Sequence, residues 1–222
     1  MKIKNKDIIA LKRKLKLAGI KGLALDIDDT LSSTKESLFE ELTKRIDNPE
    51  NLTGIEMAEK YRHTDNVPYW QTDKIEGIVK EINDAPEFHE NLPLIKNSSK
   101  TVQEINKIIP IVGYITVRST AIAKGTKKWL KKNDFPKAPI ITRPKNVDRV
   151  MGNKWKAKVL EYLYPQVVGI VDDNPGLTEF FGKKYKGVDY LYGGAKSERK
   201  DINIIPCEDW ETVAKKVKEC KL

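Results

Sequence analysis

From residue 97 onward the sequence alternates short apolar runs with segments whose apolar residues recur at helical spacing. A short apolar run bounded by turn residues is typical of a strand buried on both faces, as in a parallel sheet. The alternation predicts right-handed βαβ crossovers and an α/β, doubly wound parallel (Rossmann-like) sheet with helices on both faces. We expect strands at 110–116, 139–142, 167–171, 188–192 and 202–205, and helices at 101–108, 121–132, 154–164, 176–181 and 210–220.

A further strand is expected at residues 23–27, and it leads into three carboxylates and a hydroxyl. Asp26, Asp28 and Asp29 repel one another there unless a divalent cation keeps them ionised side by side. Ligands of open parallel sheets bind beyond the carboxyl ends of the strands. The expected strand at 110–116 ends in Thr116, and the one at 167–171 is followed by Asp172 and Asp173. The expected helix before this second strand carries Lys154, Lys156 and Lys158.

Residues 33–96 show helical periodicity without strands, which predicts a compact helical insertion. Its rings either pack in a core of its own, which we favour, or line a substrate pocket: Tyr61, His63, Tyr69, Trp70, Phe88 and His89. The expected organisation is a basic N-terminal helix and lead-in at 1–22, an α/β core at 23–32 and 97–222, and a helical cap at 33–96.

The N-terminal segment 5–18 is expected to form an amphipathic basic helix. One interpretation is a helix that packs its apolar side on the body and solvates its lysines; the other is an element that docks on a membrane surface or an anionic partner. The apolar face is narrow and lacks aromatic residues, which favours the first. That face consists of Ile8, Leu11, Leu15 and Ala18.

The formal net charge of +9 is unevenly distributed. Residues 1–22 carry eight basic side chains and one acidic one, residues 31–96 carry 8 and 14, and residues 97–222 carry 25 and 14. A protein that clamps a long polyanion keeps one sign of charge along a continuous surface. The alternation therefore argues against nucleic acid as a partner.

No apolar run reaches the roughly 18 residues of a membrane span, and the N-terminus lacks the apolar segment of a secretory signal. We expect a cytoplasmic protein without a membrane span. Cys207 and Cys220 are interpreted as structural thiols, because two cysteines make neither a disulfide framework nor a metal site by themselves. The sequence leaves the oligomeric state open.

Taken in order, the polar groups at the strand ends resemble the four motifs of the haloacid dehalogenase (HAD) superfamily. The resemblance covers residues 22–205 and implies a HAD core with a cap inserted between the first and second motifs. Asp28 is the informative residue, because the resemblance places an aspartate at that position in the phosphatases, and not in the dehalogenases or P-type ATPases. The matching segments are Asp26-Ile27-Asp28-Asp29-Thr30, Thr116 in Tyr-Ile-Thr-Val-Arg-Ser, a helical lysine, and Asp172-Asp173 in Val-Asp-Asp-Asn.

The resemblance implies a Mg²⁺-dependent phosphatase that forms an aspartyl phosphate. Asp26 would be the nucleophile, and Asp28 would protonate the leaving oxygen and then deprotonate water. Thr116 and the motif lysine would hold the transferring oxygens. The implied Mg²⁺ ligands are Asp26, the Asp28 carbonyl and Asp172, with Asp173 behind them.

Three assignments around this site rest on local spacing. Lys156 is preferred to Lys154 as the motif lysine, because it lies at the leading edge of the buried face formed by Val159, Leu160 and Leu163. Arg118 and Ser119 follow Thr116 and are candidates for contacts with the phosphate or the leaving group, and the alternative for Arg118 is a solvated surface arginine. Asp29 and Thr30 are expected to shape the turn into the insertion.

Alternatives remain at this stage. A receiver domain uses similar residues, but there the acid pair and the phosphoacceptor lie on separate strands, and an EF-hand is excluded because Leu31 and Ser37 occupy its glycine and glutamate positions. A catalytically silent HAD-fold binding or regulatory protein is the main alternative. The expected substrate is a small phosphorylated metabolite, such as a nucleotide or sugar phosphate, and the segment 88–94 resembles the same junction in deoxyribonucleotidases of this superfamily.

Overall fold

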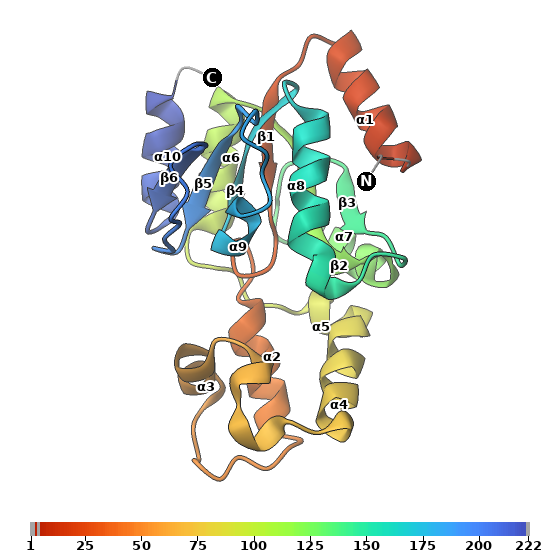
Figure 1. The fold of residues 1–222 in the computed structure, drawn as a ribbon, viewed down its shortest axis with the longest axis vertical. Helices are drawn as coiled ribbons and strands as arrows, with labels where there is room; N and C mark the ends of the chain where they lie inside the picture. The colour runs from red at the N-terminus through yellow and green to blue at the C-terminus, as the bar shows by residue number, and fades with distance from the viewer. Residues whose placement is uncertain (1–2, 4, 221–222) are drawn as a thin grey trace.

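The computed structural model describes residues 3 and 5–220 of the 222-residue chain. Its centre is a parallel sheet with the strand order β3-β2-β1-β4-β5-β6, flanked by helices on both faces (Figure 1). The predicted doubly wound α/β fold is therefore confirmed. The strands are β1 (Gly22–Leu25), β2 (Ile111–Ser119), β3 (Ile140–Arg143), β4 (Val167–Asp172), β5 (Val188–Tyr192) and β6 (Asn203–Cys207).

Two hydrophobic clusters hold the helices on the sheet, one on each face. β2 and β3 lie on one side of β1 in the sheet, and β4, β5 and β6 lie on the other. Because connections between parallel strands are right-handed, connections that run in opposite directions along the sheet place their helices on opposite faces. One face carries α6 (Ser98–Ile108), α7 (Ala123–Lys132) and α10 (Trp210–Glu219), and the other carries α1 (Lys6–Leu17), α8 (Gly152–Leu163) and α9 (Pro175–Thr178).

The N-terminal helix α1 packs as the first interpretation expects. Asn5 caps it by accepting a hydrogen bond from the Asp7 amide at 2.8 Å. Ile8, Leu11 and Leu15 are buried against the body of the protein. Ala18, the fourth residue of the predicted face, is exposed at the C-cap, so the structural role of the face is confirmed for the other three residues.

The helical insertion at 33–96 lies apart from the sheet, beyond one of its edges (Figure 1), and it has a hydrophobic cluster of its own. Phe39 stacks on Trp70 with ring centroids 5.7 Å apart, and Tyr69 packs edge-on against Trp70. Trp70 and Phe39 therefore belong to the core of the insertion, and the half-buried Tyr69 packs against it. The elements are α2 (Thr34–Thr43), α3 (Gly54–Tyr61), α4 (Asp73–Asp84) and α5 (Pro86–Glu90), with short 3-10 turns η1 (Thr64–Asn66) and η2 (Pro68–Trp70).

The structure moves several expected boundaries. β2 continues to Ser119, so Thr116 lies inside the strand and not after it, and α9 ends at Thr178. Helix α7 is preceded by the 3-10 turn η3 (Thr120–Ile122), and α8 by η4 (Arg149–Met151). Among the described residues, none of the helices is both long and apolar enough to span a bilayer.

Candidate active site

Three carboxylates meet at the carboxyl edge of the sheet, where β1 and β4 end side by side. Leu25 pairs with Val171, and the Asp26 amide donates to the Val171 carbonyl at 2.9 Å. This register places Asp26 beside Asp172, the last residue of β4, and Asp173 follows directly. Carboxylate oxygens of the three residues lie within 4.8 Å of one another. Residues about 150 positions apart in sequence therefore form one acidic triad.

Lys156 is the only positive group that α8 brings to this triad within the described chain. Its Nζ lies 2.7 Å from Asp26 Oδ1 and 2.5 Å from Asp172 Oδ2, and the residue is 1% exposed. Lys154 is exposed on the same helix. The structure thus brings Lys156, and not Lys154, to the acids. Val159, Leu160 and Leu163 are buried as expected, and Lys156 lies on the same side of the helix.

One ammonium does not neutralise three carboxylates, of which Asp26 and Asp172 are buried and Asp173 is half-buried. Burial raises the pKa of Asp26 to about 7, with Lys156 opposing the rise and the charge of Asp172 adding to it. Burial and the charges of Asp172 and Asp26 raise the pKa of Asp173 well above its ordinary value. For Lys156, burial lowers the pKa, but Asp172 and Asp26 outweigh it and the pKa rises. The triad therefore has an excess of negative charge that suits a cation.

Thr116 and Ser119 lie on β2, the strand on the other side of β1. Thr116 is fully buried, and its Oγ1 accepts a hydrogen bond from the Arg118 amide at 3.2 Å. The Ser119 hydroxyl donates to Asp84 Oδ1 at 3.5 Å, at the end of α4. Ser119 thus contacts the helical insertion in this structure, whereas Thr116 lies inside β2, two residues beyond Tyr114, the partner of Leu25.

Arg118 is directed at Asp28. Its Nε lies 3.0 Å from both Asp28 carboxylate oxygens, and Nη2 donates to Oδ1 at 2.7 Å. Nη1 donates to Thr126 Oγ1 at 3.1 Å, and Nη2 also donates to Ser32 Oγ at 3.2 Å. Thr34, the first residue of α2, donates to Asp28 Oδ1 at 2.6 Å. The guanidinium was a candidate for contacts with the phosphate or the leaving group. In this structure it binds the Asp28 carboxylate instead.

These contacts keep Asp28 ionised. Burial alone would raise the pKa of Asp28, but the charge and hydrogen bonds of Arg118 and the hydrogen bond from Thr34 lower it to about 2. At neutral pH Asp28 is therefore a carboxylate, and as long as the pair with Arg118 persists it is a weak base and has no proton to donate.

No protein-family model and no curated protein sequence matches this chain. Solved structures do match it. A HAD-superfamily hydrolase of subfamily IA from Geobacter sulfurreducens aligns over 89% of this chain and 96% of its own, with a TM-score of 0.52 and 15% identity. A candidate phosphatase from Clostridium difficile aligns over 88% and 99%, with a TM-score of 0.52 and 17% identity. A dehalogenase aligns over 87% and 95%, with a TM-score of 0.53 and 9% identity.

The chain has the HAD fold. At identities this low the structural matches show the fold alone, and any chemistry has to be argued from the residues of the site. In this HAD fold the acidic triad, Lys156 and Thr116 lie on the strands and the helix to which the four motifs were assigned from sequence.

Thr30 has a role in this HAD site that the sequence did not suggest. Its Oγ1 accepts from the Asp173 amide at 3.1 Å and donates to Asp173 Oδ1 at 3.2 Å, so it fixes the third carboxylate. Asp29 adopts a φ of 54° and accepts a hydrogen bond from the Lys35 amide at 2.8 Å. Asp29 thus shapes the turn as expected, whereas Thr30 also positions a member of the triad.

Two further titratable residues are buried near the site, and of these only His89 was named from the sequence, as a ring expected to pack in the core of the insertion. His89 on α5 is 2% exposed, and its Nε2 lies 2.9 Å from the Asn83 carbonyl. Burial and the charge of Arg118 lower the pKa of His89. Asp189 on β5 is 1% exposed, and within the described chain neither of its carboxylate oxygens has a hydrogen-bond partner. Only the folded chain reveals that these residues are buried near the charged groups.

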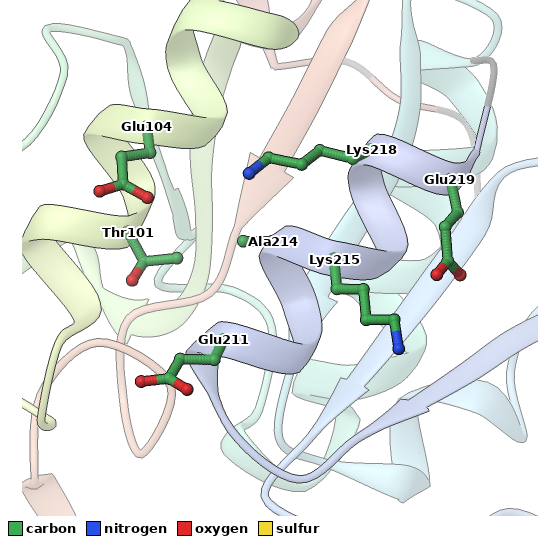
Figure 2. A pocket seen from close by; sticks show the side chains of 7 residues that line it. All are labelled: Thr101, Glu104, Glu211, Ala214, Lys215, Lys218 and Glu219. Carbon is green, nitrogen blue, oxygen red and sulfur yellow. The ribbon is translucent and has the colours of Figure 1, made fainter.

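A groove of about 450 Å³ lies away from the triad, between α6 and α10 (Figure 2). Figure 2 shows side chains of both signs along it, among them Glu104, Glu211 and Lys218. The groove lacks the convergent carboxylates and buried lysine of the HAD site. We therefore assign the candidate active site to the carboxyl edge of the sheet.

Proposed function

We propose that this protein is a Mg²⁺-dependent phosphomonoesterase that acts through an aspartyl phosphate on Asp26. The observation that carries the proposal is the buried Lys156 ammonium, 2.7 Å from Asp26 and 2.5 Å from Asp172, at the ends of two adjacent parallel strands. Asp28, two residues after Asp26, supports phosphatase over dehalogenase chemistry, because it supplies a second carboxylate for proton transfer.

The residues present fit a Mg²⁺ ion. The triad offers hard oxygen ligands with more negative charge than Lys156 balances. Asp26, Asp172 and the Asp28 carbonyl would hold the ion, and Asp173, fixed by Thr30, would support them. When bound, Mg²⁺ would offset the repulsion between the carboxylates and a phosphate dianion.

In the first half of the proposed reaction, Asp26 attacks the phosphorus and the alkoxide leaves. Lys156 favours the ionised, nucleophilic form of Asp26. Lys156 and the Thr116 hydroxyl would also hold oxygens of the transferring group, because phosphoryl transfer depends mainly on positioning and electrostatic stabilisation.

In the second half, water hydrolyses the aspartyl phosphate. Arg118 keeps the Asp28 carboxylate ionised and oriented, and Asp28 would take the proton from this water once the contact with Arg118 lengthens and its basicity rises. To protonate the leaving group in the first half, Asp28 must itself gain a proton, and the contact with Arg118 has to lengthen for that. We therefore propose Arg118 as a positioning residue for Asp28 and not as a phosphate ligand.

The substrate proposed is a small phosphorylated metabolite, such as a nucleotide or sugar phosphate. The helical insertion at 33–96 would act as a cap that excludes water over the carboxyl edge. The ends of α4 and α5 contact the core, through the hydrogen bond from Ser119 to Asp84 and the Lys128–Glu90 ion pair at 2.8 Å. These contacts hold the insertion against α7 and β2 of the core.

The decisive experiment measures phosphate release from a panel of monoesters, with and without EDTA, for the natural chain and Asp26→Asn. We expect turnover that requires the metal and is lost in the variant. Asp201→Asn, which alters a surface carboxylate paired with Arg199, is the matched control. Turnover that survives Asp26→Asn or ignores EDTA contradicts the mechanism. Halide release from haloacids would instead support a dehalogenase, and inactivity on both panels would support a binding protein.

A further inference from the structure

The end of the core opposite the acidic triad forms a surface that the proposed hydrolysis does not use. All the described strands are parallel and the covering helices return in the opposite direction, so the strand amino ends and the helix C-termini share one edge (Figure 1). We call this surface the amino pole. It consists of the last turns of α1, α6 and α7 and the connections 18–21, 109–110, 133–139, 164–166 and 179–187.

The amino pole is rich in exposed lysine. Its connections contain five lysines against Asp134 and Glu179, and the last turns of α1, α6 and α7 add five more. Each helix C-terminus contributes only about half a negative charge, which is too little to balance them. Within residues 3 and 5–220, none of these lysines forms an ion pair: Lys14, Lys16, Lys21, Lys107, Lys131, Lys132, Lys137, Lys183, Lys184 and Lys186.

Aliphatic side chains are exposed at the same pole. Leu17, the last residue of α1, is 77% exposed, Ile20 is 39% exposed, and Ile108, the last residue of α6, is 51% exposed. The chain segments that follow α1 and α6 meet at the sheet, where the Leu23 amide donates to the Pro110 carbonyl at 3.0 Å. These residues are distinct from the buried stripe of α1. Aliphatic groups therefore emerge among unpaired lysines.

We propose that the amino pole docks on an anionic lipid bilayer. Exposed aliphatic side chains can enter the boundary between headgroups and acyl chains, while flexible lysines remain at the negatively charged surface. Nucleic acid fits this surface less well, because its basic residues are all lysines, whereas bidentate phosphate recognition uses arginine. The proposal does not depend on the hydrolytic activity.

The test is sedimentation of the full chain with vesicles of phosphatidylcholine alone and with vesicles in which part of it is replaced by phosphatidylserine. We expect binding only to the anionic vesicles, weakened by salt. The combined variant Lys183→Gln, Lys184→Gln and Lys186→Gln should weaken binding about fivefold for each lysine. Leu17→Ser with Ile108→Ser should weaken it at least about tenfold, because less apolar surface enters the lipid.

Matched controls come from the helical insertion. Ile55→Ser removes an aliphatic side chain that is 55% exposed, and Lys74→Gln with Lys80→Gln removes exposed lysines, and these variants should bind like the natural chain. Circular dichroism checks that each variant is folded. Equal binding to neutral and anionic vesicles, no binding to either, or equal loss in the insertion variants overturns the proposal. So does binding to duplex DNA that Leu17→Ser and Ile108→Ser leave intact while vesicle binding is absent.

Discussion

Arg118 and Asp28 form a charged pair whose partners are unequally exposed, with the side chain of Arg118 2% exposed and that of Asp28 30%. A bidentate pair of this kind fixes both the orientation and the ionisation of the carboxylate. Loss of the guanidinium leaves a carboxylate that is partly shielded from water and has only Thr34 as a side-chain donor. The function of Arg118 is therefore expected to be exerted through Asp28.

We expect Arg118→Met to lower kcat for a phosphomonoester at least about 100-fold while KM changes little, because proton transfer by a positioned group contributes on that scale. Arg118→Lys should recover only a small part, since an ammonium cannot replace the bidentate fork. Steady-state kinetics measure both quantities. A raised KM with unchanged kcat would instead show that Arg118 binds the substrate.

Mg²⁺ binding at the triad should also stabilise the fold. At a hundredfold excess over Kd the gain in the free energy of unfolding is about 2.7 kcal/mol. Asp172→Asn should abolish the increase in Tm with Mg²⁺, because it removes one ligand and part of the negative charge. Thermal unfolding with Mg²⁺ and with EDTA checks this. An Asp201→Asn control should respond like the natural chain, and a Tm increase that persists in Asp172→Asn would contradict the assigned ligand set.

At the scale of the element, β5 carries an unpaired carboxyl in the interior. Burial, with the charge of Asp172 adding to it, raises the pKa of Asp189 well above its ordinary value. The unfolded chain releases this proton near pH 3.9, and the folded chain does so only at higher pH. Between those values the native state binds one proton more, so stability falls by about 1.4 kcal/mol per pH unit as pH rises.

Asp189→Asn should remove this loss and leave the protein more stable than the natural chain at neutral pH. Denaturant unfolding between about pH 4 and pH 8 compares the two slopes. The difference between the curves isolates Asp189 from the other carboxylates. Parallel curves would show that Asp189 keeps its ordinary pKa.

The pairing of β1 with β2 depends on a glycine at its start. An added Cβ on Gly22 would lie 2.2 Å from the Pro110 carbonyl oxygen, whereas at Gly77, inside α4, it would meet nothing within 4 Å. We expect Gly22→Ala to lower the free energy of unfolding by about 1–3 kcal/mol through overpacking. Gly77→Ala, the matched control, should raise it by up to about 1 kcal/mol. Urea unfolding distinguishes these opposite signs.

At the scale of the whole molecule, the parallel sheet separates two surfaces. The acidic triad lies at the carboxyl edge, and the amino pole lies at the other end of the same strands. A protein docked by its amino pole would keep the candidate active site directed into the aqueous phase. We therefore expect anionic vesicles to change kcat on a soluble monoester less than twofold at concentrations that bind all of the protein. Strong inhibition would indicate that the docked surface includes the site.

Local patterns in the sequence were sufficient for the architecture. Strands such as β4 are buried throughout and have no polar side chain before their last residue, because helices cover both faces, so their composition identifies them. The same argument found Lys156, since the buried residues of α8 fix which side of the helix faces the sheet. Parallel pairing then brought Asp26 and Asp172 to one edge.

Contacts between distant segments were decided only by the tertiary structure. Whether Arg118 meets a phosphate or Asp28 depends on where Thr126 and Ser32 place its guanidinium, and no spacing along the chain encodes that. The exposure of Leu17 and the burial of Asp189 depend in the same way on which neighbours cover each position. Periodicity records how residues are placed within one element, and the energies that orient a side chain come from the elements packed around it.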